Sequence, residues 1–267
     1  MTRRRLALVI ALVVSLGACS ATTGSTAPTN TRAVTILGAA SLKDVLAKLE
    51  TAYETANPGT TVSVSTDSSA ALRTQIEQGA PADVFLSADT TNPQKLVDAG
   101  LTDGAAVDFA GNLLVIVVPT DNPAKIASPA DLARSGVKVI AAGTDVPISK
   151  YADQAVGLLA KQPGYPSNFA ASYAANVVSR EDNVKAVVAK IELGEGDAGI
   201  VYVTDAAASA KVATIPIPAE GNVPATYAGV VVKASKQAAA ARAFLTWLVG
   251  ADAQAILAGF GFRPPPA

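Results

Sequence analysis

The feature that most constrains the fold is the stretch from Val62 to Asp89, in which a strand pattern, a helix pattern and a second strand pattern follow one another. Valines alternate with serines at its start, which is the period of a strand with one buried face. Leu72 and Ile76 are four residues apart, as on one helix face, and Gly79 stands where a helix commonly ends. The apolar run 84–86 then predicts a buried strand. This strand–helix–strand order is typical of α/β proteins.

The same alternation continues along the rest of the chain. Strands that alternate with helices favour parallel pairing, so the sequence predicts an α/β fold with mixed, mostly parallel sheets. The expected strands are 34–37, 62–65, 84–86, 113–118, 137–142, 177–178, 199–203, 214–218 and 226–232. The expected helices are 42–53, 69–78, 92–100, a start at 128–131, 150–161, 183–191, a start at 204–205, 237–249 and 251–257, with a turn-rich segment at 162–168.

Four junctions between an expected strand and the following helix stand out: Ser41, Ser69, the loop 144–149 and residues 182–184. Ser69 is expected to cap its helix, because serine is strongly preferred at that position. A helix start exposes N–H groups that have no partner in the helix and carries a partial positive charge, so it favours an anion. Ligands of open α/β sheets bind at the carboxyl ends of the strands. The junctions are therefore positions that favour an anion, the alternative being ordinary helix caps, and none of them carries a glycine-rich nucleotide-binding motif.

The composition excludes several other kinds of site. The chain has no histidine, which removes the commonest general base and most transition-metal sites. A formal net charge of −1 gives no reason to expect nucleic acid as a partner. Ser149 and Lys150 could be imagined as a nucleophile and its base, but adjacent residues on a helix do not face each other. We therefore expect a binding protein rather than an enzyme.

The first 19 residues are typical of a secretory signal. Arginines at 3–5 precede the apolar run 6–16, which is too short to span a membrane. The run ends in Leu-Gly-Ala-Cys, which resembles a bacterial lipobox, and Cys19 is the only cysteine of the chain. We expect Cys19 to be lipidated, residues 20–33 to be a flexible tether, and the protein to be extracytoplasmic, anchored to the outer face of the cell membrane. The alternative is an ordinary signal peptide in which the cysteine occurs by chance.

Several motifs together resemble the periplasmic molybdate-binding proteins of ABC transporters, and they occur in the same order from about Val34 to the C-terminus. The motifs are Gly38-Ala39-Ala40-Ser41-Leu42, Ser68-Ser69, residues 75–85 (QIEQGAPADVF), Ser87-Ala88-Asp89, Val146-Pro147, Glu181-Asp182-Asn183-Val184, Gly199-Ile200-Val201-Tyr202 and Gly259-Phe260-Gly261-Phe262. The resemblance implies the two-lobed type II binding-protein fold with a hinge of crossing strands. The expected lobes are 34–112 plus 228–267, and 113–227, with crossings near 113–118 and 226–232. It also implies a monomer that delivers its ligand to an ABC permease.

The resemblance also implies a ligand set, which maps onto the chain residue by residue. Two serines of the first lobe, Ser41 and Ser69, would hold the oxyanion with the backbone N–H groups of Ile148 and Val184 and the hydroxyl of Tyr202. No cofactor is implied, and the metal of molybdate would be held only through its oxygens.

Three positions depart from the family pattern. Asp67 precedes the serine pair, and a carboxylate within about 6 Å of a dianion would repel it, so Asp67 is expected to point away. Ala70 stands where many members have a third small hydroxyl residue. Ser149 follows Ile148, where the family often has a small residue, and could shift the register by one.

Alternative ligands remain open at this point. Tungstate is a near-isostere of molybdate, and sulfate is the serious rival because the same donors suit it. Iron-binding relatives use tyrosine and carboxylate ligands, and only Tyr202 is well placed for that chemistry.

Overall fold

The computed structural model describes residues 32–265. The predicted signal, the lipidation of Cys19 and most of the predicted tether therefore lie outside the described residues. The tether was predicted to extend to residue 33, and this is wrong at its end because the first strand already begins at Arg32. The backbone N–H of Arg32 donates to the carbonyl of Gly59 over 3.0 Å, which places Arg32 in the sheet.

A five-stranded sheet organises the first lobe, with the strands in the order β2-β1-β3-β10-β4. Strand β1 runs parallel to β2 and β3, whereas β10 runs antiparallel to β3 and β4. The strands are β1 (Arg32–Ala39), β2 (Thr60–Asp67), β3 (Val84–Ser87), β4 (Val107–Asn112) and β10 (Ala225–Val231). The helices are η1 (Ala40–Leu42), α1 (Lys43–Ala56), α2 (Ser69–Glu77), α3 (Thr91–Asp98), α8 (Ala238–Leu248) and α9 (Ala251–Gly259).

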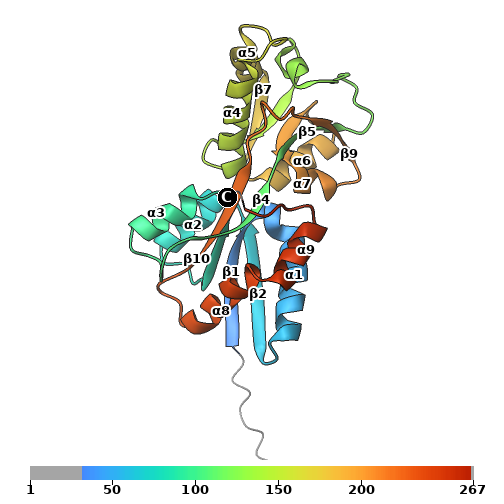
Figure 1. Cartoon of the computed structure of the whole chain (residues 1–267). Coiled ribbons are helices and arrows are strands. Elements are labelled where there is room, and N and C mark those ends of the chain that lie inside the picture. The colour runs from blue at the N-terminus through green and yellow to red at the C-terminus, as the bar shows by residue number, and fades with distance from the viewer. Residues whose placement is uncertain (1–31, 266–267) are drawn as a thin grey trace, which may run out of the picture. The chain divides into compact units, whose positions relative to one another are not determined.

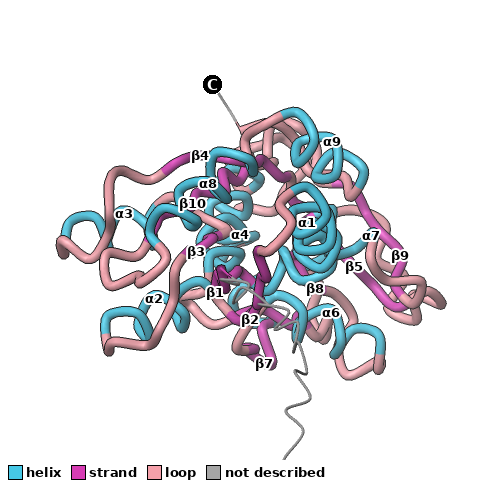
Figure 2. Tube along the Cα trace, turned by 90° about the horizontal axis from the view of Figure 1, so that it is seen from below, coloured by secondary structure: helices cyan, strands magenta, loops and turns pink. Residues whose placement is uncertain are grey.

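The helices of this lobe cover both faces of the sheet. Side chains of β1 alternate between the faces, so that Ile36 packs in a cluster with Leu46 of α1 and Phe244 of α8, and Leu37 packs with Leu72 of α2. Figure 2 shows the strands between α2 and α3 on one side and α1 on the other. The carboxyl ends of β1, β2 and β3 are left free for a site.

The second lobe is built on two smaller sheets (Figure 1). In one sheet β5 lies between β8 and β9 and is antiparallel to both; in the other β6 and β7 are parallel. The strands are β5 (Leu114–Pro119), β6 (Val139–Ala142), β7 (Val177–Glu181), β8 (Gly199–Tyr202) and β9 (Val212–Pro216). The helices are η2 (Pro129–Ala133), α4 (Pro147–Leu159), α5 (Phe169–Asn176), α6 (Val184–Glu192) and α7 (Val203–Ala207).

The chain passes between the two lobes twice. Strand β4 ends at Asn112 and β5 begins at Leu114, so Leu113 alone separates a strand of the first lobe from a strand of the second. The return runs from β9 to β10, and β10 pairs with β4 from Ala225 onward. The fold class is confirmed as α/β with mixed sheets. The exact lobe bounds, 34–112 plus 228–267 and 113–227, stay a prediction.

The balance of strand directions differs from the expected parallel majority. Among the described ladders, three are parallel and four are antiparallel. The four antiparallel ladders all involve β5 or β10, the strands by which the chain enters the second lobe and returns to the first. The local strand–helix pattern does not reveal the direction in which these two strands pair.

Three helices also differ from the sequence prediction. Helix α4 begins at Pro147 rather than at Lys150, because proline is well suited to the first helical position. The segment at 128–131 starts a short 3-10 helix. Helix α5 was missed, although Phe169 and Tyr173, four residues apart, are both buried.

Candidate functional site

A small pocket lies where the carboxyl ends of strands in the first lobe meet helix starts in the second. The space open to the centre of a water-sized molecule is only about 10 Å³, which is about the room that one small bound species needs. The pocket therefore suits a small ion. The lining residues are Ala39, Ala40, Ser41, Ser68, Ser69 and Ala88 of the first lobe, and Val146, Pro147, Ile148, Asn183, Val184 and Tyr202 of the second.

All five residues of the predicted ligand set line this one pocket. They come from five different elements, and each is buried. No side chain among the twelve lining residues is charged. The pocket can thus offer hydroxyl and N–H groups to an anion but no fixed counter-charge.

Ser69 is not the cap of its helix, which corrects the sequence prediction. Ser68 is the N-cap, in an extended conformation (φ −61°, ψ 142°), and its hydroxyl oxygen accepts from the N–H of Ala71 over 3.2 Å. Ser69 is the first residue of α2, and its oxygen accepts from the N–H of Ala88 over 3.0 Å. The N–H of Ala88 thus occupies an acceptor site of Ser69, and the Ser69 hydroxyl proton remains for the pocket.

Ser41 lies in η1, directly after β1, and is also held by a donor of the protein. Its hydroxyl oxygen lies 3.0 Å from the hydroxyl of Tyr227 on β10. Tyr227 is fully buried and does not line the pocket. Sequence reasoning missed Tyr227 because 186 positions separate it from Ser41.

Backbone groups dominate the second lobe's share of the pocket. Val184 is the first residue of α6 and Ile148 the second residue of α4, and the first N–H groups of a helix have no partner within it. The Asn183 side chain caps α6 by accepting from the N–H of Ala186 over 3.1 Å, which leaves the N–H of Val184 to the pocket. Both helix starts also carry partial positive charge.

The hydrogen bonds of Ser149 are made within the second lobe and not toward the pocket. Ser149 donates its N–H to the carbonyl of Val146 over 3.0 Å and its hydroxyl to the carbonyl of Ala142 over 2.8 Å. Both donors are thus used within the second lobe, and Ser149 is not among the lining residues. Ile148 therefore lines the pocket without a shift.

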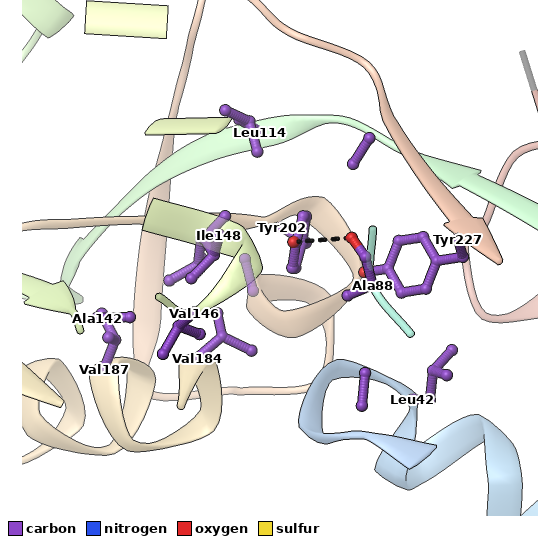
Figure 3. Packing of buried hydrophobic residues seen from close by; sticks show 14 of the residues in the cluster. Leu42, Ala88, Leu114, Ala142, Val146, Ile148, Val184, Val187, Tyr202 and Tyr227 are labelled. Carbon is purple, nitrogen blue, oxygen red and sulfur yellow. Dashed lines mark hydrogen bonds between the residues drawn. The ribbon is translucent and has the colours of Figure 1, made fainter. Parts of the chain in front are cut away.

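Tyr202 ends β8, and its hydroxyl reaches across to the first lobe. The hydroxyl donates to the carbonyl of Ala88 over 3.4 Å, as Figure 3 shows. Burial is the main cause that raises the pKa of Tyr202 well above that of a free phenol, so the hydroxyl keeps its proton and remains a donor. A bond of 3.4 Å is long, so the hydroxyl can turn toward a ligand at small cost.

The two departures beside the serine pair lie outside the lining. Asp67 accepts from the N–H of Ser68 over 2.7 Å and from the side-chain amide of Asn183 over 3.4 Å. Its carboxylate thus bonds two residues that line the pocket, while Asp67 itself is not among the lining residues. That Asp67 points away from the ligand stays a prediction. Ala70 does not line the pocket either.

An ion network joins the lobes beside the pocket. Lys185 of α6 lies 2.6 Å from the carboxylate of Asp44 on α1 and 3.3 Å from that of Asp205 on α7. Among the described residues, no partner of the buried Asp205 carboxylate has good hydrogen-bond geometry, although Lys185 Nζ lies 3.3 Å from Oδ1. Burial raises the pKa of Asp205 to about 6, although Lys185 lowers it. No local sequence signal marks this network, since 141 positions separate Lys185 from Asp44.

Residues 34–263 match the family of bacterial extracellular solute-binding proteins. The chain belongs to this family. Among its relatives, the molybdate-binding protein ModA of Mycobacterium tuberculosis H37Rv is 35% identical over 264 residues, which is 97% of this chain and 95% of that protein. ModA of Haemophilus influenzae is 32% identical over 86% of this chain and 89% of its own length. Members of the family bind solutes outside the cytoplasm.

Solved structures of solute-binding proteins have the same fold. The periplasmic molybdate-binding protein of Azotobacter vinelandii superposes with a TM-score of 0.74 at 25% identity, over 87% of this chain and all of that one. The two-lobed binding-protein fold is thus confirmed. No helix in the stretch 32–265 has the length and apolar character needed to cross a membrane.

Proposed function

We propose that this solute-binding protein captures molybdate, and tungstate as its near-isostere, in the pocket between the lobes and delivers it to an ABC permease. The observation that carries the proposal is that hydroxyl and N–H donors of Ser41, Ser69, Ile148, Val184 and Tyr202 converge on one small pocket with no charged side chain in its lining. Two relatives that cover most of the chain are named molybdate-binding proteins, which supports this ligand.

The donors suit an anion that carries no proton. Molybdate, tungstate and sulfate are fully deprotonated near neutral pH and can accept at every oxygen, whereas phosphate carries at least one proton. A buried donor without an acceptor costs about 1–3 kcal/mol. The helix starts at Ile148 and Val184 and the bonds to hydroxyls offset the ligand's charge without a lysine or arginine in the lining.

Competition calorimetry at neutral pH tests the ligand. Molybdate and tungstate should bind with similar affinity, sulfate more weakly because its shorter bonds stretch the hydrogen bonds, and phosphate at least tenfold more weakly than molybdate, since ~1.4 kcal/mol is a factor of ten. Sulfate binding tighter than molybdate would overturn the molybdate assignment and favour a sulfate-binding protein. Phosphate binding as tightly as molybdate would show that a carboxylate such as Asp67 reaches the ligand.

We also propose that Cys19 carries a lipid that anchors the protein to the outer face of the cell membrane. The support is the position of the only cysteine at the end of the predicted signal. Replacing it (Cys19→Ala) should move the protein from the membrane fraction to the released fraction and leave ligand affinity unchanged. A variant that stays with the membrane would refute the anchor. We expect the purified protein to be a monomer, which sedimentation checks.

A further inference from the structure

A chain of hydrogen bonds runs from the hinge to Ser41 in the pocket. The Tyr227 hydroxyl lies 3.0 Å from Ser41 Oγ and 3.4 Å from Asn112 Nδ2. Asn112 Nδ2 also donates to Thr204 Oγ1 over 2.8 Å. Asn112 ends β4 and Tyr227 lies in β10, so both belong to strands beside the crossings between the lobes. Asn112 and Tyr227 are both buried, and water cannot easily replace these bonds.

A backbone N–H fixes the orientation of the Asn112 side chain. The N–H of Leu113 donates to Asn112 Oδ1 over 3.0 Å. A backbone N–H can only donate, so the amide oxygen must face Leu113 and the NH₂ group must face Tyr227 and Thr204. The two amide protons then match the two acceptors, the hydroxyl oxygens of Tyr227 and Thr204.

This orientation sets the direction of the bond between Tyr227 and Ser41. Because Asn112 Nδ2 offers only protons, it cannot accept the hydroxyl proton of Tyr227. Among the hydrogen bonds of residues 32–265, Ser41 Oγ is the acceptor within reach of that proton. Burial raises the pKa of Tyr227 well above that of a free phenol, so the proton stays on the hydroxyl. Ser41 accepts from Tyr227, and its own proton is left for the pocket.

We propose that Tyr227 is a specificity-determining residue: by donating to Ser41 it holds the Ser41 proton toward the pocket, so that Ser41 meets the ligand as a donor and a protonated oxyanion such as phosphate is disfavoured. This inference rests on the proposed oxyanion function and deepens it. Ser69 is set in the same way by the N–H of Ala88, but that donor is a backbone group, which only a proline at position 88 would delete. Tyr227 is therefore the place where the selectivity of the pocket can be changed. Each donor in such a chain also polarises the next, which strengthens the last bond to the ligand.

The substitution Tyr227→Phe isolates the hydroxyl. It keeps the ring, which packs edge-on against Phe109 and Phe262 with centroids 6.1 and 5.4 Å away. It removes the donor that holds the Ser41 proton toward the pocket, so the Ser41 hydroxyl can turn and accept from a protonated ligand. We expect the molybdate dissociation constant to rise about three- to tenfold, because Ser41 loses its fixed orientation. The ratio of the phosphate to the molybdate dissociation constant should fall at least tenfold. Calorimetry with sodium molybdate and sodium phosphate measures both.

Tyr151→Phe is the matched control. Tyr151 lies in the same aromatic cluster, 6.3 Å from Tyr202 between ring centroids, and its hydroxyl accepts from the N–H of Thr226 rather than contacting the pocket. This variant should keep the wild-type ratio. In a Ser41→Ala background, Tyr227→Phe should no longer change the ratio, because its effect passes through the Ser41 hydroxyl. Equal weakening of both ligands by Tyr227→Phe, or the same change of ratio in Tyr151→Phe, would overturn the proposal.

A second variant covers the case in which Tyr227→Phe does not fold. Asn112→Asp keeps the acceptor for Leu113 and turns the group that faces Tyr227 into an acceptor, so the Tyr227 proton should turn away from Ser41 and the ratio should fall. An unchanged ratio would contradict the inference. If the wild-type protein binds sulfate and not molybdate, the proposed ligand is wrong, but the phosphate-to-sulfate ratio still tests Tyr227 in the same variants.

Discussion

The two lobes contribute different kinds of donor to the same pocket. The first lobe offers side-chain hydroxyls, Ser41 and Ser69, whose protons rotate freely unless a neighbouring donor fixes them. The second lobe offers chiefly backbone N–H groups at Ile148 and Val184, whose directions are set by the helices themselves. A hydroxyl thus needs a partner that fixes the direction of its proton, and a backbone N–H does not. Tyr227 donates to Ser41, and the N–H of Ala88 donates to Ser69.

The lobes also differ in the acids that they place around Lys185. Asp44 of the first lobe is half exposed, with 47% of its side chain accessible, whereas the side chain of Asp205 in the second lobe is fully buried. The ion pair of Lys185 with Asp44 is therefore screened by water, whereas burial of the Asp205 carboxylate carries a desolvation penalty.

The largest effect is expected when both hydroxyls of the first lobe are removed. Each hydrogen bond to a charged ligand contributes on the order of 1.5–3 kcal/mol. The double variant Ser41→Ala/Ser69→Ala should therefore weaken molybdate binding by about 3–6 kcal/mol if the two effects add. Titration calorimetry measures the loss.

Ser68→Ala is the control for this pair. Ser68 caps α2, so its loss should lower the free energy of unfolding by about 1 kcal/mol and weaken binding less than Ser69→Ala does. If Ser68→Ala costs more affinity than Ser69→Ala, the ligand contact belongs to Ser68 instead.

The backbone donors of the second lobe can be tested by a proline. Val184 occupies the first helical position and follows an extended Asn183 (φ −156°, ψ 171°), so Val184→Pro fits the backbone and removes only the N–H and part of the side chain. We expect a loss of about 1.5–3 kcal/mol in binding free energy. Val184→Ala keeps the N–H and should bind nearly as well as wild type. Equal losses in the two variants would assign the effect to the side chain and contradict a backbone contact.

The buried acid of the second lobe should make stability depend on pH. The pKa of Asp205 is raised to about 6 from 3.8, chiefly by burial, so the folded state binds the proton more tightly than the unfolded state. Its stabilising contribution is complete below the unfolded pKa and is lost as the pH rises through about 6. Between about pH 4.5 and about pH 6.5 this loss amounts to about 2 kcal/mol.

Asp205→Asn removes this titration. The unfolding free energy of the variant should therefore rise relative to wild type over the same pH range, as measured by urea denaturation. A difference between variant and wild type that does not change with pH would mean that Asp205 stays ionised throughout.

The smallest effect is expected at the exposed acid of the first lobe. Asp44→Asn removes the partner of Lys185 across the lobes and leaves the contact with Asp205. Exposed ion pairs contribute about 0.2–1 kcal/mol and are screened by salt, so molybdate affinity should fall less than fivefold at low salt and match wild type at high salt. A large loss of affinity that persists at high salt would show that the Lys185–Asp44 pair is shielded from solvent as well as Asp205 is.

The local parts of the site could be predicted from the sequence. Strand-to-helix junctions follow from hydrophobic period and helix-start signals, so Ser41, Ser69 and Val184 stood out without a structure. The same signals predicted Ser69 as the N-cap of α2, one residue after the true cap, Ser68. Two adjacent serines suit the position equally well, and only the backbone conformation distinguishes them. The start of α4 at Pro147 was missed for a similar reason, since Ile148 and Ser149 fit a loop as well as a first turn.

The parts that depend on chain crossings could not be predicted. The bond from Tyr227 to Ser41 and that from Lys185 to Asp44 join residues 186 and 141 positions apart. The geometry of these bonds depends on how the chain crosses between the lobes near β4 and β10. The hydrophobic periodicity of the sequence contains no information about this crossing. The antiparallel direction of β10 was hidden for the same reason.

The uncharged lining of the pocket has a consequence for the electrophoretic behaviour of the protein. A site whose lining has a group that titrates near neutral pH can take up a proton as a dianion binds, which offsets part of the added charge. Here the lining has no such group, so the loaded protein would be more negative than the empty one by the full charge of its ligand. Loaded and empty forms should separate as distinct bands on a native gel, with the loaded form nearer the anode.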